Sequence, residues 1–519
     1  MSSKRLTWPE PSARFACAVM LAVVASSGSP ASVSATSAAT EAPPSPQIIT
    51  HELKPAETQE DFARLRFNLA HAHAAPYRYT SEAELNRQLD ALGRRLDHPM
   101  TDLDFYRLLA PLIAEIRNSH TSIQPPADAL RSMRTYQSVF PFILRYRDGR
   151  AFIEVNLSND TTIRPGMEVL SLGDRSMADV TRNLMENRSA EGFDESGKYA
   201  RLDQTFWLDF MLKFGPSARY AVRVRNATDG EESEHTVAGA SAERLAAAVP
   251  QFPSVSGPTQ SLTIERESGI AVMRLKNFLE PDTPAFFQKA FHDLAVSGAR
   301  NLIIDLRGNH GGIDWFNSEL LSYLSSSPFR FYKKRSYRVQ SYDDLKYLTY
   351  NLDDFLFPDQ IAALPAAVRE RPFQHWTLPQ LIDLSLATDH AGGVQVPKAT
   401  DHFAGRVYLL IDGMSGSSSA EVPALMHHLG LATIIGEDPN GSYQGEVAGI
   451  IPTLTLPNSK LNIRIPLIAY QNEVMPGVRV GRAVEPTFTV SETLDDSIAG
   501  VDTVMEFTKA LIFARAPAK

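Results

Sequence analysis

The feature that most constrains the fold is a regular alternation of strand and helix patterns between residues 270 and 436. Four apolar segments have the length and composition of buried strands: IAVMRL (270–275), NLIIDL (301–306), VYLLID (407–412) and TIIG (433–436). Helix patterns separate them, over 283–294, 314–324 and 421–429. Strands of this kind, connected through helices, form a parallel buried sheet. The sequence therefore predicts an α/β domain in this part of the chain.

The preceding residues divide into a helical part and a β-rich part. One helix face carries leucines at four- and three-residue spacings, Leu85, Leu89, Leu92 and Leu96, and Ser81 with Glu84 has the spacing of a capping box at its start. Short β patterns follow: FPFILRY (140–146), AFIEV (151–155) and YAVRVRN (220–226). A short helix is expected between the last two, over 177–185. We expect these domains: helical N-terminal over 51–128, β-rich over 129–257, and α/β over 258–519 with an insertion at 340–400 that acts as a lid over a cleft.

The first 35 residues have the three regions of a secretory signal peptide. Basic residues up to Arg14 precede the apolar run FACAVMLAVVA, and small residues follow up to Val33-Ser34-Ala35. The apolar run is too short to span a bilayer stably. We expect a signal peptide over 1–35, a linker over 36–50, export to a periplasm or beyond, and no membrane span after signal removal.

Composition excludes several classes of protein. The chain has 519 residues, 43% of them hydrophobic, which suits about three globular domains rather than a disordered or multi-span membrane protein. The net charge is −9, and no basic stripe typical of nucleic-acid binding is present. The single cysteine, Cys17, lies in the signal segment, so a thiol nucleophile or disulfide framework is not expected. No His-Glu-x-x-His pattern occurs, and we expect neither a metal site nor a cofactor.

Three short segments combine chemically useful residues with the end of an element. LRGNHGG (306–312) follows a strand, and its glycines let backbone N–H groups approach an oxyanion or a phosphate. IDGMSGSSSAE (411–421) places four serines between a strand and a helix, whose free N–H groups stabilise an oxyanion. IRNSHTSI (116–123) places His120 at a helix end. Each segment alone also fits a structural role as a tight turn, an N-cap or a helix end.

Several known motifs are absent from these segments. LRGNHGG lacks the Lys-Ser/Thr ending of a phosphate-binding P-loop. Ser-x-x-Lys occurs nowhere, which excludes a β-lactamase-type site. The α/β-hydrolase elbow Gly-x-Ser-x-Gly is incomplete at 413–417, and no histidine follows His428.

Taken in order, the segments resemble those of the serine peptidase family that contains the C-terminal processing (tail-specific) peptidases and the tricorn core proteases. LIIDLRGNHGG is similar to the family's DLRxNxGG segment, and SSAE (418–421) to its nucleophile turn. IIGEDPNG (434–441) resembles its GE.T.G stretch, VGRAVEPTFTV (480–490) its terminal G.GV.PD segment, and NSHT (118–121) its tricorn-like SHT element. The resemblance covers nearly all of the exported chain.

The resemblance implies a crotonase-like α/β catalytic domain and a PDZ-like domain, the latter around IRPGMEVLSLGD (163–174). It also implies a nucleophilic serine, for which we select Ser418 because it stands three residues before Glu421. The oxyanion would be held by the N–H groups of Ser419 and of Gly311 or Gly312.

The base is the point at which the two branches of the family differ. The lysine of the tail-specific branch is missing, because residues 441–444 are Gly-Ser-Tyr-Gln. The tricorn-like branch implies His120 as the base, with Ser119 beside it and a later glutamate. Glu473 is our choice for that glutamate, with Glu485 left open.

The sequence thus predicts a secreted serine endopeptidase that acts on a peptide or protein substrate through an acyl-enzyme. The alternative is a peptide-binding relative that kept the fold and lost turnover, and the missing lysine is what keeps this alternative open. A third class, an acyl-CoA enzyme of the crotonase type, shares the implied sheet and glycine loop. The export signal disfavours this class because acyl-CoA is cytosolic.

Overall fold

The computed structural model describes residues 47–248, 257–349 and 393–515. The predicted signal peptide, most of the linker and most of the 340–400 insertion lie outside these residues. Within them, every helix is too short or too polar to cross a bilayer.

The α/β domain is built on a six-stranded sheet with the order β22-β17-β16-β11-β10-β9. Its strands are β9 (Gln260–Glu265), β10 (Ile270–Leu275), β11 (Asn301–Asp305), β16 (Arg406–Ile411), β17 (Thr433–Gly436) and β22 (Phe488–Thr489). All neighbours from β10 to β22 pair in parallel, and β9 alone is antiparallel to β10. The four strands predicted from the sequence are all present, and they form the parallel core of the sheet.

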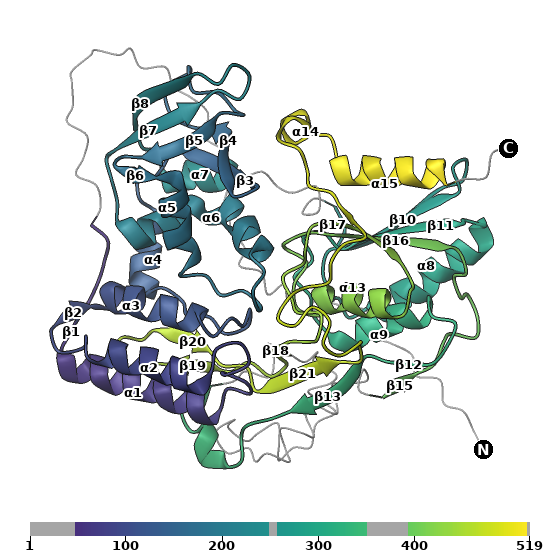
Figure 1. The fold of residues 1–519 in the computed structure, drawn as a ribbon, viewed down its shortest axis with the longest axis horizontal. Helices are drawn as coiled ribbons and strands as arrows, with labels where there is room; N and C mark the ends of the chain where they lie inside the picture. The colour runs from purple at the N-terminus through teal and green to yellow at the C-terminus, as the bar shows by residue number, and fades with distance from the viewer. Residues whose placement is uncertain (1–46, 249–256, 350–392, 516–519) are drawn as a thin grey trace, which may run out of the picture.

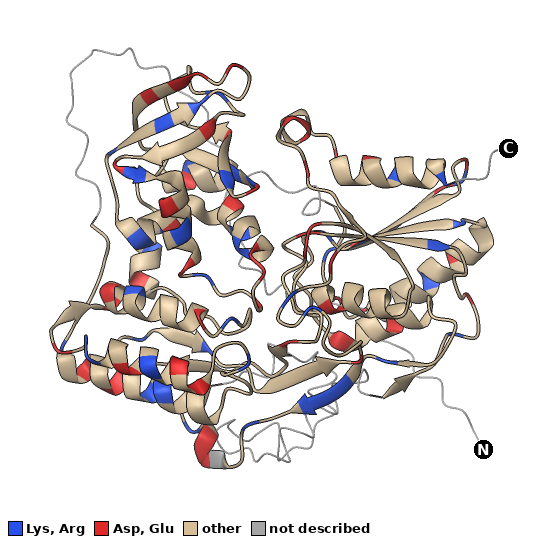
Figure 2. Cartoon of the chain, in the orientation of Figure 1, with Lys and Arg blue, Asp and Glu red and all other residues tan. Residues whose placement is uncertain are grey.

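Helices cover both faces of this sheet (Figure 1). The helices α8 (Thr283–Ser297), α9 (Asp314–Ser322) and α13 (Ser418–His428) pack on one face, and α15 (Thr503–Ala514) packs on the other. Side chains alternate along each strand, so that Ile303 faces α15 while its neighbours Leu302 and Ile304 face the other layer. Figure 2 shows few charged residues on these strands, which agrees with their burial.

The N-terminal part is helical as predicted. Its elements are α1 (Pro55–His71), α2 (Glu82–Gly93), α3 (Asp102–Ala114) and α4 (Ala127–Arg134), with a small pair β1 (Glu52–Leu53) and β2 (Met100–Thr101). Ser81 caps α2 by accepting the N–H of Glu84, as the capping pattern indicated. Charges of both signs are interleaved on α1 and α2 (Figure 2).

The β-rich part contains an antiparallel sheet with the order β3-β4-β5-β7-β8. Its strands are β3 (Phe142–Arg147), β4 (Arg150–Asn156), β5 (Glu168–Leu172), β7 (Arg219–Arg225) and β8 (Glu232–Ala238), with β6 (Arg175–Ser176) beside β5. Helices α5 (Met177–Met185), α6 (Ser196–Phe214) and α7 (Ala242–Ala248) accompany it. The sequence predicted α5 with these bounds, whereas the long α6 was not predicted. Phe206 and Phe210 of α6 pack against Phe140 next to β3.

Small sheets pair separate segments of residues 329–472. They are β13 (Tyr332–Ser336) with β21 (Ile468–Asn472) and β18 (Val447–Ala448), β14 (Leu348–Thr349) with β19 (Thr453–Thr455) and β20 (Asn462–Arg464), and β12 (Phe329–Arg330) with β15 (Val394–Gln395). Ile123 bridges to Ile463 of β20, and the Asn118 side chain donates to the carbonyl of Val447 in β18. The predicted histidine segment 116–123 is thereby held beside the α/β domain.

Candidate active site

His120 and Ser417 meet in space although 297 residues separate them in sequence. The Nε2 atom of His120 lies 3.0 Å from Oγ of Ser417. This distance and pairing are those of a serine hydroxyl and the base that accepts its proton. His120 comes from the loop after α3, and Ser417 from the turn between β16 and α13.

Ser417 is the N-cap of α13 and has an unusual backbone conformation, with φ 53° and ψ −135°. A non-glycine residue rarely adopts a positive φ, and such strain costs about 1–3 kcal/mol where the surroundings impose it. Here the turn aims the side chain away from the helix and toward His120. The site therefore holds Ser417 in a conformation that its local sequence does not favour.

The choice of Ser418 as the serine beside His120 was wrong by one residue. Ser418 begins α13 and is 1% exposed, and its Oγ has no hydrogen-bond partner among the described residues. Its carbonyl oxygen accepts a hydrogen bond from the Asn317 side chain. The spacing to Glu421 pointed to Ser418, but the left-handed turn at the preceding residue directs Ser417, and not Ser418, to the histidine.

The LRGNHGG loop packs directly against this turn. Asn309 is fully buried and fixes the loop: its Nδ2 donates to the Leu275 carbonyl and its Oδ1 accepts the N–H of Gly311. A Cβ built on Gly311 would lie 2.8 Å from Cβ of Ser417 and 2.9 Å from N of Ser418. Glycine is required here because no side chain fits between the loop and the serine turn.

Two backbone N–H groups near Ser417 remain available for an oxyanion. The expected donor Ser419 N–H is already bonded to the Gly416 carbonyl, so that expectation was wrong. The N–H of Gly311 is likewise bonded to Asn309, whereas within the described parts of the chain the N–H groups of Ser418 and Gly312 have no acceptor. The N–H groups available to bind an oxyanion are therefore those of Ser418 and of Gly312, the last glycine of the loop.

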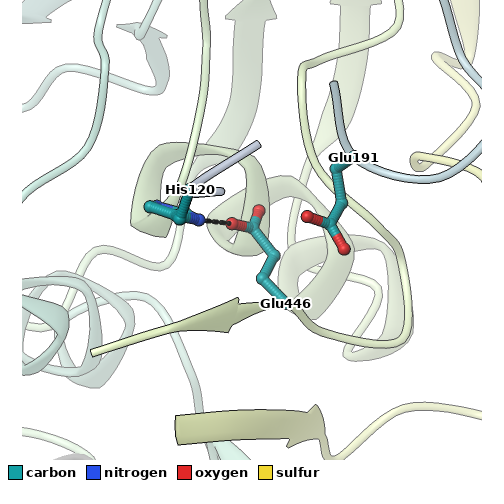
Figure 3. Close-up of side chains that lie close together, drawn as sticks. All are labelled: His120, Glu191 and Glu446. Carbon is teal, nitrogen blue, oxygen red and sulfur yellow. Dashed lines mark ion pairs between the residues drawn. The ribbon is translucent and has the colours of Figure 1, made fainter. Parts of the chain in front are cut away.

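On its other side the His120 ring meets the Ser119 hydroxyl and the Glu446 carboxylate, and Figure 3 shows the carboxylate beside the ring. Its Nδ1 lies 3.1 Å from Oγ of Ser119 and 3.5 Å from Oε2 of Glu446. Ser119 thus stands beside the histidine as expected. The glutamate beside the ring is Glu446 and not Glu473, whose backbone N–H donates to the Phe331 carbonyl.

A second carboxylate, Glu191, lies behind Ser119. Its Oε2 accepts hydrogen bonds from the Asn118 side chain at 2.8 Å and the Ser119 N–H at 3.1 Å, and its Oε1 accepts one from the Tyr79 hydroxyl at 2.9 Å. Glu191 is 1% exposed. It fixes the backbone that carries His120. The other glutamate left open, Glu485, instead pairs with Arg479 and is exposed.

Burial sets the charge state of this cluster. Burial, together with the positive charges of Arg464 and Arg201, lowers the pKa of His120 to about 3. Burial also raises the pKa of Glu446 well above its usual range, and the neighbouring carboxylates Glu191 and Glu421 act in the same direction. The imidazole is therefore neutral at neutral pH, which is the form that accepts a proton.

The helical N-terminal part is hydrogen-bonded to the histidine segment 116–123. His73 Nε2 lies 2.7 Å from Oγ1 of Thr121, and Thr121 in turn donates to Oδ1 of Asn118. His73 is fully buried, and its Nδ1 accepts the N–H of Ala75. These bonds fix the residue on each side of the Ser119–His120 pair.

Comparison with known proteins identifies the architecture. Residues 269–489, which include Ser417, Glu446, Gly311 and Gly312, match the model of Peptidase family S41. The match covers a little under half of the chain, and it supports the S41 family and a serine-type peptidase, a hydrolase that acts on peptides or proteins. No curated protein sequence matches the chain.

Solved structures agree with this S41 assignment at the level of the fold. Mature CPAF is 15% identical with a TM-score of 0.57, and the match covers 89% of this chain and 99% of that chain. A serine-to-alanine mutant of CPAF is 14% identical with a TM-score of 0.58, over 89% and 97% of the two chains. Mature CPAF complexed with lactacystin is 15% identical with a TM-score of 0.56, over 88% and 98%.

Sequence reasoning missed two residues of the site, Glu191 and Glu446. Glu191 lies after α5 in a segment without a recognisable motif. Glu446 follows the GEDPNG stretch, close to where the tail-specific branch carries its lysine, and this position was the available signal. A Cβ on Gly441 would lie 2.4 Å from Oε1 of Glu446, so the last glycine of that stretch leaves room for this carboxylate.

Proposed function

We propose that the chain is an exported serine endopeptidase that cleaves peptide bonds through an acyl-enzyme on Ser417, with His120 as the general base. The observation that carries this proposal is the 3.0 Å distance between Nε2 of His120 and Oγ of Ser417. The family match supports the reaction class, and the geometry supports these residue roles.

In the first half of the reaction, Ser417 Oγ attacks the carbonyl carbon of the scissile peptide bond. Its proton passes to Nε2 of His120, and the oxygen of the tetrahedral intermediate is bound by the N–H groups of Ser418 and Gly312. The C–N bond then breaks, and His120 returns the proton to the leaving amine. In the second half, water loses a proton to His120 and attacks the ester carbon. The bond to Ser417 Oγ then breaks, His120 returns the proton to that oxygen, and the acid product leaves.

Ser119 and Glu446 serve as positioning residues for the ring. Acceptors on the Nδ1 side hold the proton on Nδ1, which leaves the Nε2 lone pair directed at Ser417. The positive charge that His120 gains during the reaction lies next to a buried carboxyl group with no other cation within hydrogen-bond distance among the described residues. That charge favours the ionised form of Glu446 at the step where it stabilises the imidazolium.

The remaining expectations concern the whole chain. We propose that the β3–β8 unit is a PDZ-like domain that binds the substrate, that the α/β domain is the crotonase-like catalytic domain, and that the predicted boundaries 51–128, 129–257 and 258–519 separate the parts. We also propose that the protein is exported through the signal peptide at 1–35, and that it hydrolyses peptide or protein substrates without a cofactor.

The experiment that tests the proposal compares Ser417→Ala with Ser418→Ala on casein and on a library of fluorogenic peptides. Ser417→Ala should lose turnover to background, because Ser417 is the hydroxyl that lies against Nε2 of His120, whereas Ser119 lies on the Nδ1 side. Ser418→Ala should keep most of its activity, because that hydroxyl is buried without a partner. The thermal stability of each variant serves as the folding control. Loss of turnover in Ser418→Ala with activity retained in Ser417→Ala would disprove the assignment. An inactive wild-type protein would favour the alternative of a peptide-binding relative.

A further inference from the structure

Three side chains with metal-ligating atoms converge behind the catalytic ring. One nitrogen of His120 and one oxygen each of Glu191 and Glu446 lie within 4.8 Å of one another (Figure 3). They come from three separate parts of the chain: the loop after α3, the turn after α5, and the residue before β18. No sequence motif links them, which is why the sequence indicated no metal site.

The state of Glu446 points to a missing partner. Its side chain is 1% exposed, and neither of its oxygens has a hydrogen-bond partner in the described residues. A buried carboxylate without donors is costly, and proteins normally provide such a group with a partner or a metal ion. Figure 3 shows this carboxylate turned toward the His120 ring.

The spacing suits a small tetrahedral ion. Zinc binds imidazole nitrogen and carboxylate oxygen at about 2.0–2.2 Å, so neighbouring ligand atoms of a tetrahedral site lie about 3.4 Å apart. Nδ1 of His120 and Oε2 of Glu446 are 3.5 Å apart. The ligand oxygen of Glu191 lies within 4.8 Å of the other two ligand atoms, so it completes the set with a shift of up to about 1.4 Å. Magnesium and calcium prefer sites made only of oxygen, and the imidazole disfavours them.

We propose that His120, Glu191 and Glu446 bind one zinc ion, and that this ion reversibly inhibits the peptidase. Binding at Nδ1 uses the lone pair of that atom, so the neutral ring then carries its proton on Nε2. Nε2 faces Oγ of Ser417 at 3.0 Å. A ring in this state cannot accept the serine proton, and the zinc-bound enzyme is inactive until the ion leaves.

Binding is tested without any reference to catalysis. Metal-free Ser417→Ala protein, which keeps all three ligands, is titrated with zinc chloride by isothermal titration calorimetry. We expect one equivalent to bind, and Glu446→Gln or Glu191→Gln in the same background to weaken binding by at least about tenfold. Glu473→Gln, which changes a glutamate outside the cluster, should bind as the parent does. Magnesium and calcium chloride should give no saturable binding at the same concentrations.

The ligands themselves are identified by X-ray absorption at the zinc edge on the loaded Ser417→Ala protein. This measurement does not depend on the folding of a ligand variant. We expect nitrogen and oxygen atoms bound to zinc at about 2.0–2.1 Å, including a single imidazole.

The inhibitory role of zinc rests on the proposed function, and it is measured in a separate experiment. Zinc should inhibit the wild-type enzyme at concentrations that match its dissociation constant, and a chelator should restore the rate. Loss of zinc binding in the Ser417→Ala parent, equal binding in Glu446→Gln, or more than one imidazole on the ion would overturn the site. Binding without inhibition would overturn the inhibitory role. A failure of the proposed function would instead appear as activity retained in Ser417→Ala, whatever the zinc result.

Discussion

Replacing Gly311 by alanine should abolish most of the turnover while leaving the protein folded. Gly311 has φ +93°, and the added methyl group would lie 2.7 Å from the Gly416 carbonyl oxygen, 2.8 Å from Cβ of Ser417 and 2.9 Å from N of Ser418. Ordinary contacts between carbon atoms are about 3.5–4.0 Å. The loop and the serine turn must therefore separate by about 1 Å. This separation displaces both the Ser418 N–H and the Ser417 hydroxyl from their positions.

The expected loss of kcat follows from the oxyanion donor that this separation displaces. Loss of one oxyanion donor typically costs about 2.7–4 kcal/mol in the transition state, or about 10²–10³ in kcat. A misplacement of about 1 Å elsewhere in a site has a comparable effect. We expect kcat of Gly311→Ala to fall by at least about a hundredfold.

A second glycine provides the matched control for backbone strain. Gly298 ends α8 with φ +71°, and a Cβ there would meet no atom within 4 Å. Both alanine variants force a left-handed conformation on an L-residue, which costs about 1–2 kcal/mol in each. Steady-state kinetics on a fluorogenic peptide, with urea denaturation for stability, separates the two effects. The reasoning is refuted if Gly311→Ala and Gly298→Ala have the same kcat.

The remaining predictions concern the histidine and its supports. Glu446→Gln keeps the shape of the side chain but cannot ionise, so kcat should fall by about 10²–10⁴-fold. The control variant Glu473→Gln should leave kcat unchanged. Equal rates in the two variants would argue against the role of Glu446. Burial and the charge of Arg338 lower the pKa of His73 to about 3. Between pH 6.5 and pH 3, His73 is therefore protonated in the unfolded chain and not in the folded one. The free energy of unfolding falls as the pH falls through this range. From pH 7 to pH 5 the wild type should therefore lose about 2 kcal/mol more stability than His73→Gln in urea denaturation, and equal losses would contradict this prediction.

The sheet was predictable because its signal is local. Each parallel strand is a short apolar run that ends in a turn, and the segment from Ile270 to Gly436 repeats this pattern with helices between. The helix α5 was predictable with its bounds because its pattern also lies within a short stretch of sequence. The early histidine was also found, since Ser119-His120 stands in a recognisable pattern.

The serine that lies beside His120 was not predictable because three serines stand side by side. The choice depends on the φ angle of Ser417, and that angle is imposed by tertiary contacts with the glycine loop around Gly311. The two carboxylates were missed for a different reason. Glu191 and Glu446 gain their meaning only from burial next to His120, and burial of a glutamate is set by the packing of distant segments.

The central claim is that Ser417 is a nucleophile activated by His120, and covalent labelling tests it most directly. The wild-type protein and His120→Ala are treated with a fluorophosphonate probe, and the modified residue is located by mass spectrometry of the peptide that spans 411–428. The account predicts a single adduct on Ser417 in the wild type and little or none in His120→Ala, because the serine reacts only when its proton has an acceptor at 3.0 Å. An adduct on Ser418, or equal labelling of the two proteins, would contradict it.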